Sequence, residues 1–510
     1  MNKELFMGID VGTSAVKILV ADRQGSIVSS GSSSYKIDKI KDNYAEQNPE
    51  IWWQAVKKIL SNLDCNLKDV KSIGMSGQLN GIVSIKENGE IVRNAIIWLD
   101  QRAEKEVEYL NNNYLDKIKK YTYSKPGTIY SLTKLLWLRN NEEENFKNTY
   151  KFLAVKDYIS YKLTNNFVTD MSDAGAAQLL NLNKRDWCYE ILEEIVDLNK
   201  LPELLESPDL AGKVTEKAAE ETGFKIGTPV IVGAGDMAAL ALGTGVVKPN
   251  TACATIGTAG HTAAFIEELP KEMDDRLWVM CHAVPNKYFW HGLVMTGGYC
   301  LSWFINNFAS LEEKNSANSD NSIFDILLNR LSKIEVGSNG IIFLPFLNGE
   351  ATPGKDSKAK AAFLGIESSS DRLEMARSVL EGVCYNFKES FEIFDEINNL
   401  NIKEVMIGEG GSQNSLWPQI MADVLEKEVL SFKELNSSAL GAVILAGVGA
   451  GYWDTFTDAV DNFCKIKEIK NYDELNSKKY EKYYGLYKLA KNNLKEFNSE
   501  LQNIRRNLND

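Results

Sequence analysis

The residues from Asp10 to Ser14 combine a carboxylate, a glycine and two hydroxyls in one short turn. The turn lies between two apolar runs, 6–9 and 15–20, which predict two strands joined as a hairpin. Backbone N–H groups around Gly12 can approach phosphate oxygens closely, and the Asp10 carboxylate can reach the hydration shell of Mg²⁺. The pattern therefore fits a site for a metal-bound polyphosphate. An ordinary hairpin with an Asp-x-Gly-Thr turn has the same pattern, so this stretch alone leaves both interpretations open.

Similar chemistry returns near the middle of the chain. Residues 227–247 read as an apolar strand, then Asp236 between small residues, then a helix of small residues. Asp236 could approach a substrate hydroxyl there, although a helix N-cap is the commoner role for such an aspartate. Residues 251–266 then repeat the order strand, Gly-Thr turn, strand. The repeat suggests two similar halves facing one cleft, and we predict domains at 1–245 and 246–510.

Polar residues also follow other predicted strands. The β runs within 70–85 flank the loop from Ser76 to Gly81, and a predicted strand at 94–100 ends in Asp100-Gln101-Arg102. A helix is predicted at 50–63, and a glycine turn at 408–411 separates a strand from a helix within 404–425. Strands that alternate with helices indicate an α/β fold, in which ligands bind at the carboxyl ends of the strands.

The remaining segments have clear patterns without an assigned chemistry. Residues 169–182 are rich in Asp and Ser and predict a helix cap or loop. The tail at 466–510 predicts a pair of Lys/Glu/Asn-rich helices with an apolar stripe and a solvated charged face. Further helices are predicted at 103–120, 131–140, 152–163 and 437–451.

Length and charge limit the classes of partner. A chain of 510 residues is too long for one ordinary core, and 44% hydrophobic residues can fill two. The net charge is −13 and the basic residues are dispersed, so we expect no nucleic-acid partner and no binding to an anionic membrane. An anionic substrate would have to be held by local donors and a cation.

The cysteines and histidines point away from disulfide and metal frameworks. The seven cysteines are odd in number, far apart and free of any C-x-x-C pair, which is typical of reduced thiols in a cytosolic protein. The three histidines are scattered, and we interpret them as structural. The first residues enter a strand at once and no run of 18 apolar residues follows, so we expect a cytoplasmic location.

Taken together and in order, these stretches resemble the FGGY carbohydrate kinase family, and within it the xylulokinase branch. The resemblance runs over about 6–455 and includes the second family signature at 361–381. The blocks that carry it include MGIDVGTSAVK, SGQ, AIIWLDQR, TDMSDA, GAGDMAA, FLPFLNGEATP and GEGGSQNSLWPQIMADVL.

The resemblance implies a fold and a set of roles. The fold would be α/β, with two ribonuclease H-like (actin/hexokinase-like) domains flanking an interdomain cleft where ATP and sugar meet. Asp10 would be the Mg²⁺-associated aspartate and Asp236 the catalytic base. ATP would be bound by two phosphate loops and an adenosine turn, made of Gly12, Thr13, Ser14 and Lys17; Thr255, Gly257 and Thr258; and Gly410, Gly411, Ser412 and Asn414.

The expected sugar pocket departs from the xylulokinase pattern. It comprises Gln78, Leu79, Asn80, Asp100, Arg102, Asp236 and Met237. Leu79-Asn80 stands where that branch usually has Met-His or Gln-His, Met237 replaces an asparagine, and Ala351 replaces an arginine. Because unpaired buried polar groups discriminate strongly between substrates, these changes leave the acceptor open.

The resemblance implies an ATP- and Mg²⁺-dependent kinase that acts on a terminal hydroxyl of a ketopentose, with D-xylulose as the first expectation. Ribulose, ribitol or an erythritol-like polyol is the alternative acceptor. A nucleotide-dependent sensor on the same fold, without kinase activity, is the alternative of another class. The resemblance also suggests a homodimer.

Overall fold

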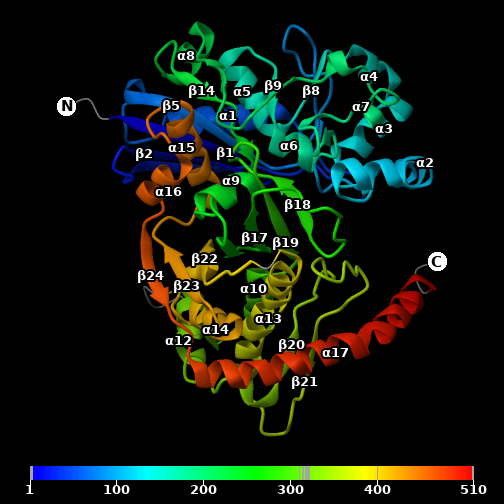
Figure 1. The fold of residues 1–510 in the computed structure, drawn as a ribbon, viewed down its shortest axis with the longest axis vertical. Coiled ribbons are helices and arrows are strands. Elements are labelled where there is room, and N and C mark those ends of the chain that lie inside the picture. Colours follow the sequence, from blue (N-terminus) through cyan, green and yellow to red (C-terminus); the bar gives the residue numbers. More distant parts are fainter. Residues whose placement is uncertain (1–3, 309–310, 313–314, 316–321, 399, 508–510) are drawn as a thin grey trace. The chain divides into compact units, whose positions relative to one another are not determined.

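The computed structural model describes residues 4–507 apart from 309–310, 313–314, 316–321 and 399 (Figure 1). The chain divides into two compact units. The first unit comprises Met1–Val247, Ile266–Phe289 and Asn436–Lys465, and the second comprises Lys248–Phe265, Trp290–Leu435 and Ile466–Asp510. These units are discontinuous in sequence, whereas the predicted division at 1–245 and 246–510 is continuous. That division stays a prediction.

The first unit is built on a sheet whose strand order is β13-β14-β5-β1-β2-β3, with β15 also paired to β5. β1 pairs antiparallel with β2, as the hairpin pattern at 6–20 predicts, and parallel with β5. The strand bounds are β1 Leu5–Val11, β2 Ala15–Asp22, β3 Ile27–Ser34, β5 Val70–Gly77, β13 Leu210–Lys213, β14 Pro229–Ile231 and β15 Ala234–Gly235. Every residue of β1 is buried, so this strand is the centre of the core.

A helix from late in the sequence packs on this sheet. α15 (Ser437–Gly449) contacts β1 and β5 and also packs against α9 (Asp236–Gly243). The backbones approach closely because glycines face the helix: a Cβ built at Gly8 would lie 2.2 Å from the Ala439 carbonyl oxygen, and one at Gly74 would lie 2.0 Å from that of Ala442. Glycines at these two strand positions are therefore a packing requirement.

Helices and short strands complete the first unit. The segment 169–182, for which the sequence predicts a cap or loop, forms β9, α6 and β10, and the strand predicted at 94–100 is reduced to the two-residue β7. The bounds of all these helices and short strands of the first unit are β4 Glu46–Gln47, α1 Pro49–Leu60, β6 Val83–Ile85, β7 Ala95–Ile96, α2 Glu104–Thr122, α3 Ser131–Asn141, α4 Glu143–Asn148, β8 Lys151–Leu153, α5 Val155–Thr164, β9 Val168–Asp170, α6 Met171–Ala176, β10 Leu180–Asn181, β11 Asp186–Trp187, α7 Tyr189–Leu192, β12 Glu203–Leu205, α8 Glu216–Thr222 and α16 Phe456–Phe463.

The second unit repeats the central topology of the first. β16 (Ala252–Ile256) pairs antiparallel with β17 (Gly260–Ile266) and parallel with β22 (Glu404–Gly408). This is the relation that β1 has to β2 and β5, and in both hairpins the turn contains Gly-Thr. The strands of this unit follow the order β19-β17-β16-β22-β23-β24. Their further bounds are β19 Tyr288–Val294, β23 Glu428–Phe432 and β24 Ile466–Lys470, and β18 (Trp278–Cys281) lies in the segment 266–289 of the first unit.

The tail differs from the predicted helix pair. It forms β24, at the edge of the sheet, followed by one long helix, α17 (Glu474–Asn507), drawn in red in Figure 1. Gly485 is the one residue that could have broken the helix, and an isolated glycine is tolerated there. The remaining elements are α10 Gly298–Phe308, α12 Ile323–Leu331, β20 Ile342–Leu344, β21 Ala362–Leu364, α13 Arg372–Asn398 and α14 Leu416–Leu425.

Among the described residues, no helix combines the length and the apolar character needed to cross a membrane.

Candidate functional site

Polar side chains lie at the carboxyl ends of three neighbouring strands of the first unit, β1, β5 and β15. β1 and β5 run parallel, so Asp10 near the end of β1 lies opposite Ser76 near the end of β5, and the Ser76 hydroxyl donates to Asp10 Oδ1 at 2.9 Å. β15 pairs parallel with β5, and its last residue, Gly235, directly precedes Asp236, the first residue of α9. The carboxyl ends of parallel strands are the usual ligand position in α/β sheets.

Asp10 is close enough to Asp236 for its charge to affect the ionisation of Asp236. Desolvation and, to a smaller extent, the charge of Asp10 together raise the pKa of Asp236 to about 8, against the opposing effect of the Met237 backbone N–H. Desolvation also raises the pKa of Asp10, which the Ser76 hydroxyl and the charge of Lys17 partly offset. Asp236 remains partly accessible to solvent. A carboxylate with a pKa in this range is suited to accept a proton near neutral pH.

The hairpin turn beside Asp10 is held from several sides. The Trp98 indole N–H donates to Thr13 Oγ1 at 2.8 Å, and Gln47 Nε2 donates to the Thr13 carbonyl at 2.8 Å. Gln78 is buried and donates from Nε2 to Gln47 Oε1 at 3.0 Å. Because Gln47 in turn bonds the Thr13 carbonyl, Gln78 supports the turn through Gln47. Ser14 is exposed at the tip. Three of the predicted phosphate-loop residues of the first unit, Gly12, Thr13 and Ser14, therefore share one turn, in which Trp98 holds the Thr13 hydroxyl, and Lys17 follows in β2 opposite Asp10.

The loop after β5 lies next to the Asp236 turn. Leu79 packs on Gly235 so tightly that a Cβ there would lie 2.1 Å from Leu79 Cδ2. Asn80 adopts a φ of 62° and is buried, and its Oδ1 has no hydrogen-bond partner among the described residues. Its carbonyl accepts from Lys134 Nζ at 3.0 Å. Burial lowers the pKa of Lys134 to about 7.

Asp100 and Arg102 are paired with each other. Arg102 donates to both carboxylate oxygens of Asp100 at 2.7–2.8 Å and to Glu46 Oε1 at 2.7 Å, and its guanidinium stacks over Tyr44 and Trp137. The second Asp100 oxygen also accepts from the Ala45 N–H at 2.6 Å. This pair orders the segment after β7. Binding of substrate by these two residues stays a prediction.

A buried charge cluster, to which no role was assigned from the sequence pattern, lies next to the turn that carries Asp236. Lys156 Nζ is 2.6, 3.0 and 3.2 Å from carboxylate oxygens of Asp157, Asp170 and Asp173, and all four side chains are buried. Burial and the neighbouring carboxylates raise the pKa of Asp173 well above its ordinary value. The raised pKa favours the protonated form of Asp173, and a proton there reduces the excess negative charge around Lys156.

Ser172 connects this cluster to the turn that carries Asp236. Its hydroxyl donates to Asp170 Oδ2 at 2.5 Å and accepts from the Gly235 N–H at 2.9 Å. The Ser207 hydroxyl donates to the same Asp170 oxygen at 2.8 Å. Asp170 also caps α6 through the Ser172 N–H. The position of Asp236 thus depends on Ser172, a residue whose only signal in the sequence is the Asp/Ser-rich run.

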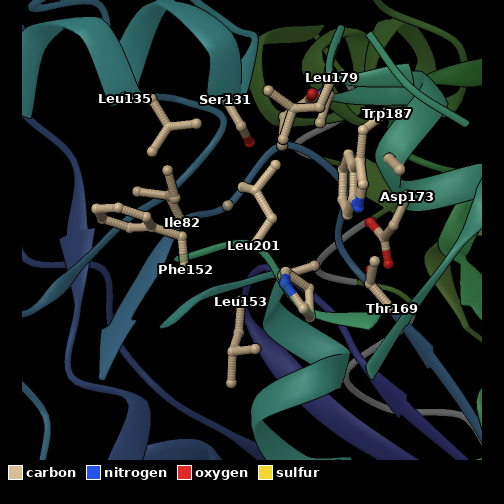
Figure 2. Close-up of a pocket in the computed structure, with 16 residues that line it drawn as sticks. Ile82, Ser131, Leu135, Phe152, Leu153, Thr169, Asp173, Leu179, Trp187 and Leu201 are labelled. Carbon is tan, nitrogen blue, oxygen red and sulfur yellow. The ribbon is translucent and has the colours of Figure 1, made fainter. Parts of the chain in front are cut away.

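A small cavity separates this cluster from the loop at Asn80 (Figure 2). Figure 2 shows Asp173 and Thr169 on the same side of the cavity as Trp187, with Ile82 and Phe152 on the other side. The cavity volume is about 30 Å³. That is room for a water molecule or two and too little for a sugar, so this cavity is not the substrate site.

The second unit contains a larger cavity lined by glycines. It has a volume of about 460 Å³ and is formed by the β16–β17 turn, the start of α10 and the turn between β22 and α14. Five of the predicted ATP-binding residues line it: Gly257, Thr258, Gly410, Gly411 and Asn414. A volume of this size is typical of small-ligand sites. A Cβ at Gly411 would lie 2.5 Å from Ile256 Cβ, so only glycine fits there without displacement.

Two predicted residues of this unit support the loops without lining the cavity. Ser412 is buried and donates to the Glu409 carbonyl at 2.7 Å. Thr255 is buried in β16, and its Oγ1 has no hydrogen-bond partner among the described residues. Asn414 lines the cavity and also supports the local structure. Its Oδ1 accepts from the Leu416 N–H at 2.7 Å, which orders the start of α14.

Comparison with known proteins places this geometry in a family. The N-terminal domain model of the FGGY family of carbohydrate kinases matches residues 5–243, and the C-terminal domain model matches residues 241–450. A xylulose kinase of Staphylococcus xylosus is 33% identical over 94% of this chain and 98% of its own length. A xylulose kinase of Bacillus subtilis is 30% identical over 98% and 99%, and a gluconokinase of the same species is 29% identical over 89% of each chain.

Solved structures agree with this assignment. A ligand-bound xylulose kinase from Lactobacillus acidophilus has a TM-score of 0.86 at 25% identity, over 96% of this chain and 98% of that one. A gluconate kinase from the same organism has a TM-score of 0.85, also at 25% identity, over 96% and 98%. The predicted two-domain α/β kinase fold is confirmed.

Proposed function

The chain belongs to the FGGY family of carbohydrate kinases, and we propose that, within this family of ATP-dependent sugar kinases, it phosphorylates a terminal hydroxyl of a ketopentose. The proposed reaction converts D-xylulose and ATP into D-xylulose 5-phosphate and ADP. The acceptor is supported by likeness to xylulose kinases along nearly the full chain. The single structural observation that supports the mechanism is Asp236, with its raised pKa, beside Asp10 at the ends of three strands.

Asp236 is the proposed catalytic base. It would accept the proton of the sugar hydroxyl as the hydroxyl oxygen attacks the γ-phosphorus, and ADP would leave with the electrons of the broken P–O bond. Its carboxyl is positioned by α9 and by the Ser172 bond to Gly235, so little reorganisation is needed during the reaction. Phosphoryl transfer demands mainly positioning and charge stabilisation, which these residues can supply.

Asp10 is the proposed ligand for hydrated Mg²⁺. Its side chain is buried, Ser76 orients one carboxylate oxygen, and Lys17 lies close enough to affect its charge. The described residues contain no cluster of three or more His, Cys, Asp or Glu that could enclose a metal. This fits Mg²⁺, which usually keeps several waters and is bound by one or two carboxylates together with substrate phosphates. Bound Mg²⁺ would neutralise phosphate charge.

ATP is the phosphate donor of this family, and its placement here is a proposal. We place the adenosine in the 460 Å³ cavity of the second unit, against Gly410, Gly411 and Asn414. Gly257 and Thr258 would contact phosphates through backbone N–H groups. Gly12, Thr13, Ser14 and Lys17 of the first unit would contact the transferring end, with Thr13 fixed by Trp98.

The sugar pocket is proposed to include Leu79, Asn80 and Met237, the residues that depart from the xylulokinase pattern. Leu79 packs against Gly235 beside the base, and the unpartnered Asn80 Oδ1 is an acceptor that a sugar hydroxyl could satisfy. Asp100 and Arg102 would act by fixing this region, since their charged groups bond each other and Glu46. Gln78 would do so through Nε2, which donates to Gln47, while its buried Oε1 has no partner among the described residues and could also accept from the sugar. A homodimer and a cytoplasmic location complete the proposal.

An ADP-release screen tests the acceptor. Purified enzyme is assayed with MgATP and D-xylulose, ribulose, ribitol, erythritol and gluconate, and each phosphorylated product is identified by mass spectrometry. We expect D-xylulose to give the highest kcat/KM. A higher value for another acceptor would replace D-xylulose in the proposal. ATP hydrolysis that yields no phosphosugar with any acceptor would instead support a nucleotide-dependent sensor.

A further inference from the structure

Lys134, in α3, carries its ammonium group into the interior of the first unit, where it is 0% exposed. Its Nζ donates to the Asn80 carbonyl at 3.0 Å and to the Ile129 carbonyl. Burial lowers the pKa of Lys134 to about 7, and the charge of Asp100 opposes this shift. A buried ammonium group held by neutral carbonyls costs free energy that an apolar side chain of similar length would not cost. Its presence therefore indicates a role other than packing.

One of the two carbonyls belongs to a residue in an unusual backbone conformation. Asn80 has a φ of 62°, in the left-handed region that residues other than glycine seldom adopt. The next residue, Gly81, packs so closely that a Cβ there would lie 2.4 Å from Val155 Cγ2. Lys134 holds Asn80 itself through the carbonyl. Such a conformation persists where surrounding contacts enforce it, and it sets the direction in which the Asn80 side chain leaves the backbone.

The side chain that is fixed in this way has an unused hydrogen-bond acceptor. Asn80 is 7% exposed, and its Oδ1 has no hydrogen-bond partner among the described residues. Buried polar atoms of this kind are rare, and each one calls for a partner from outside the chain, such as a ligand or a water molecule. Leu79, directly before Asn80, packs against Gly235 in the turn that carries Asp236. The free acceptor therefore belongs to the surroundings of the proposed base.

The other end of the link is attached to a fixed part of the unit. Ile129 lies two residues before α3, and at the start of this helix the Thr133 hydroxyl donates to the Tyr130 carbonyl at 2.7 Å. The Leu132 N–H donates at 3.1 Å to the carbonyl of Ala177, the residue after α6. The start of α6 supports the turn of the proposed base. One framework therefore holds both the base and the loop that contains the free acceptor.

We propose that Lys134 is a positioning residue that determines acceptor specificity: it holds the Asn80 carbonyl and so directs the Asn80 amide toward a hydroxyl group of the sugar. This rests on the proposed function, which places Asn80 in the sugar pocket. Lys134 itself does not contact the sugar in this arrangement. Without its two hydrogen bonds the Asn80 amide would be free to turn, and an amide without a fixed direction discriminates less well between hydroxylated acceptors.

Steady-state kinetics of Lys134→Met tests the proposal, with the sugar or polyol that has the highest kcat/KM in the ADP-release screen. Methionine removes the ammonium group and keeps a side chain of similar length. We expect the KM for this acceptor to rise about tenfold or more, because the oriented hydrogen bond to the sugar is lost, and the KM for ATP to stay unchanged. The ratio of kcat/KM between the best and the second-best acceptor should fall by a similar factor.

Asn80→Gly tests whether Lys134 acts through the Asn80 amide. Glycine adopts a φ of 62° without strain, so this variant removes the acceptor and keeps the loop conformation. It should raise the KM for the sugar as Lys134→Met does. The double variant should be no worse than Asn80→Gly alone, because Lys134 then has no amide left to direct.

Lys200→Met is the matched control. The Lys200 ammonium group also donates to backbone carbonyls, those of Phe146, Lys147 and Thr149. It lies outside the proposed sugar pocket, so its loss should leave both KM values unchanged. If Lys134→Met does not fold, Lys134→Gln, which keeps an N–H donor on a shorter chain, takes its place in the same comparison with Asn80→Gly and should give a smaller rise in the KM for the sugar.

Several results would overturn the proposal. An unchanged KM for the sugar in Lys134→Met or in Asn80→Gly, or additive effects in the double variant, would show that Lys134 does not act through the Asn80 amide. Equal increases in the KM for ATP and for the sugar, with a lowered Tm, would show that Lys134 only supports the fold. A wild-type enzyme that phosphorylates no acceptor would refute the proposed function and this inference with it, whereas the other failures appear only in the variants.

Discussion

Replacement of Asp236 by Asn should strongly slow phosphorylation and at the same time stabilise the folded protein. The ionised carboxylate of Asp236 is desolvated and lies near the charge of Asp10, and both effects raise its pKa to about 8. An amide of the same shape removes the charge and keeps most of the packing. If Asp236 is the base, kcat should fall by about 10²–10⁴-fold, the usual contribution of a general base.

The size of the stabilisation follows from linkage between ionisation and folding. In the unfolded chain Asp236 ionises near its usual pKa of 3.8, whereas in the folded protein it ionises near 8. Between these values the folded protein holds a proton that the unfolded chain has released, so wild-type stability falls as pH rises through this window and is level above it. At about 1.36 kcal/mol per pKa unit, the fall totals about 6 kcal/mol, of which about 4 has occurred by pH 7.

Thermal unfolding between pH 4 and pH 9 measures this effect. The Tm of Asp236→Asn minus that of the wild type should increase with pH by several degrees and become constant above pH 8. Asp454→Asn, at an exposed aspartate of the same unit, is the control and should show no such trend. A Tm difference that stays constant from pH 5 to pH 9 would refute the reasoning, because Asp236 would then ionise as an ordinary aspartate.

Three further predictions concern the same machinery. The kcat/KM of the wild type should decrease about tenfold per pH unit below about pH 8, since Asp236 must be ionised to act; a pH–rate profile measures this. Gly411→Ala should raise the KM for ATP and leave that for the sugar unchanged, because the new Cβ would lie 2.5 Å from Ile256 Cβ; steady-state kinetics with each substrate varied measures both. Ser172→Ala should lower kcat about tenfold with little change in KM, because the Gly235 N–H loses its acceptor, and Ser172→Thr should recover part of the loss.

Each of these has an outcome that contradicts it. A flat pH profile from pH 6 to pH 9 would mean that proton transfer to Asp236 does not limit the reaction. Equal increases in both KM values for Gly411→Ala would indicate general unfolding of the second unit. For Ser172→Ala, a lowered Tm with an unchanged kcat would show that Ser172 supports the fold and does not position Asp236.

The central strands and turns were predictable because their patterns are local. The hairpins at 6–20 and 251–266 each contain two apolar runs and a Gly-Thr turn, and this is sufficient to specify β1–β2 and β16–β17. Parallel pairing of β5 with β1 then places Ser76 opposite Asp10. The position of Asp236 beside Asp10 follows from long-range pairing of β15, which the resemblance implied and no local pattern could show.

Other features depend on contacts between distant segments and were missed for that reason. The cluster around Lys156 joins α5, β9 and α6, and nothing in the spacing of its acidic residues shows that they share one buried lysine. The predicted helix pair at 466–510 was wrong because its first part pairs with β23 as an edge strand. That choice is made by the neighbouring sheet and not by local propensity.

The position of α15 in the first unit has a consequence for biosynthesis. Its residues cover β1 and β5, yet they are translated only after most of the second unit, residues 248–265 and 290–435, has been made. During synthesis, the sheet of the amino-terminal half therefore keeps one face exposed, including the surface at Gly8 and Gly74 that α15 contacts. This face is covered only after α15 has left the ribosome. Truncation of the gene before residue 437 would yield a polypeptide that retains Asp10 and Asp236 but aggregates.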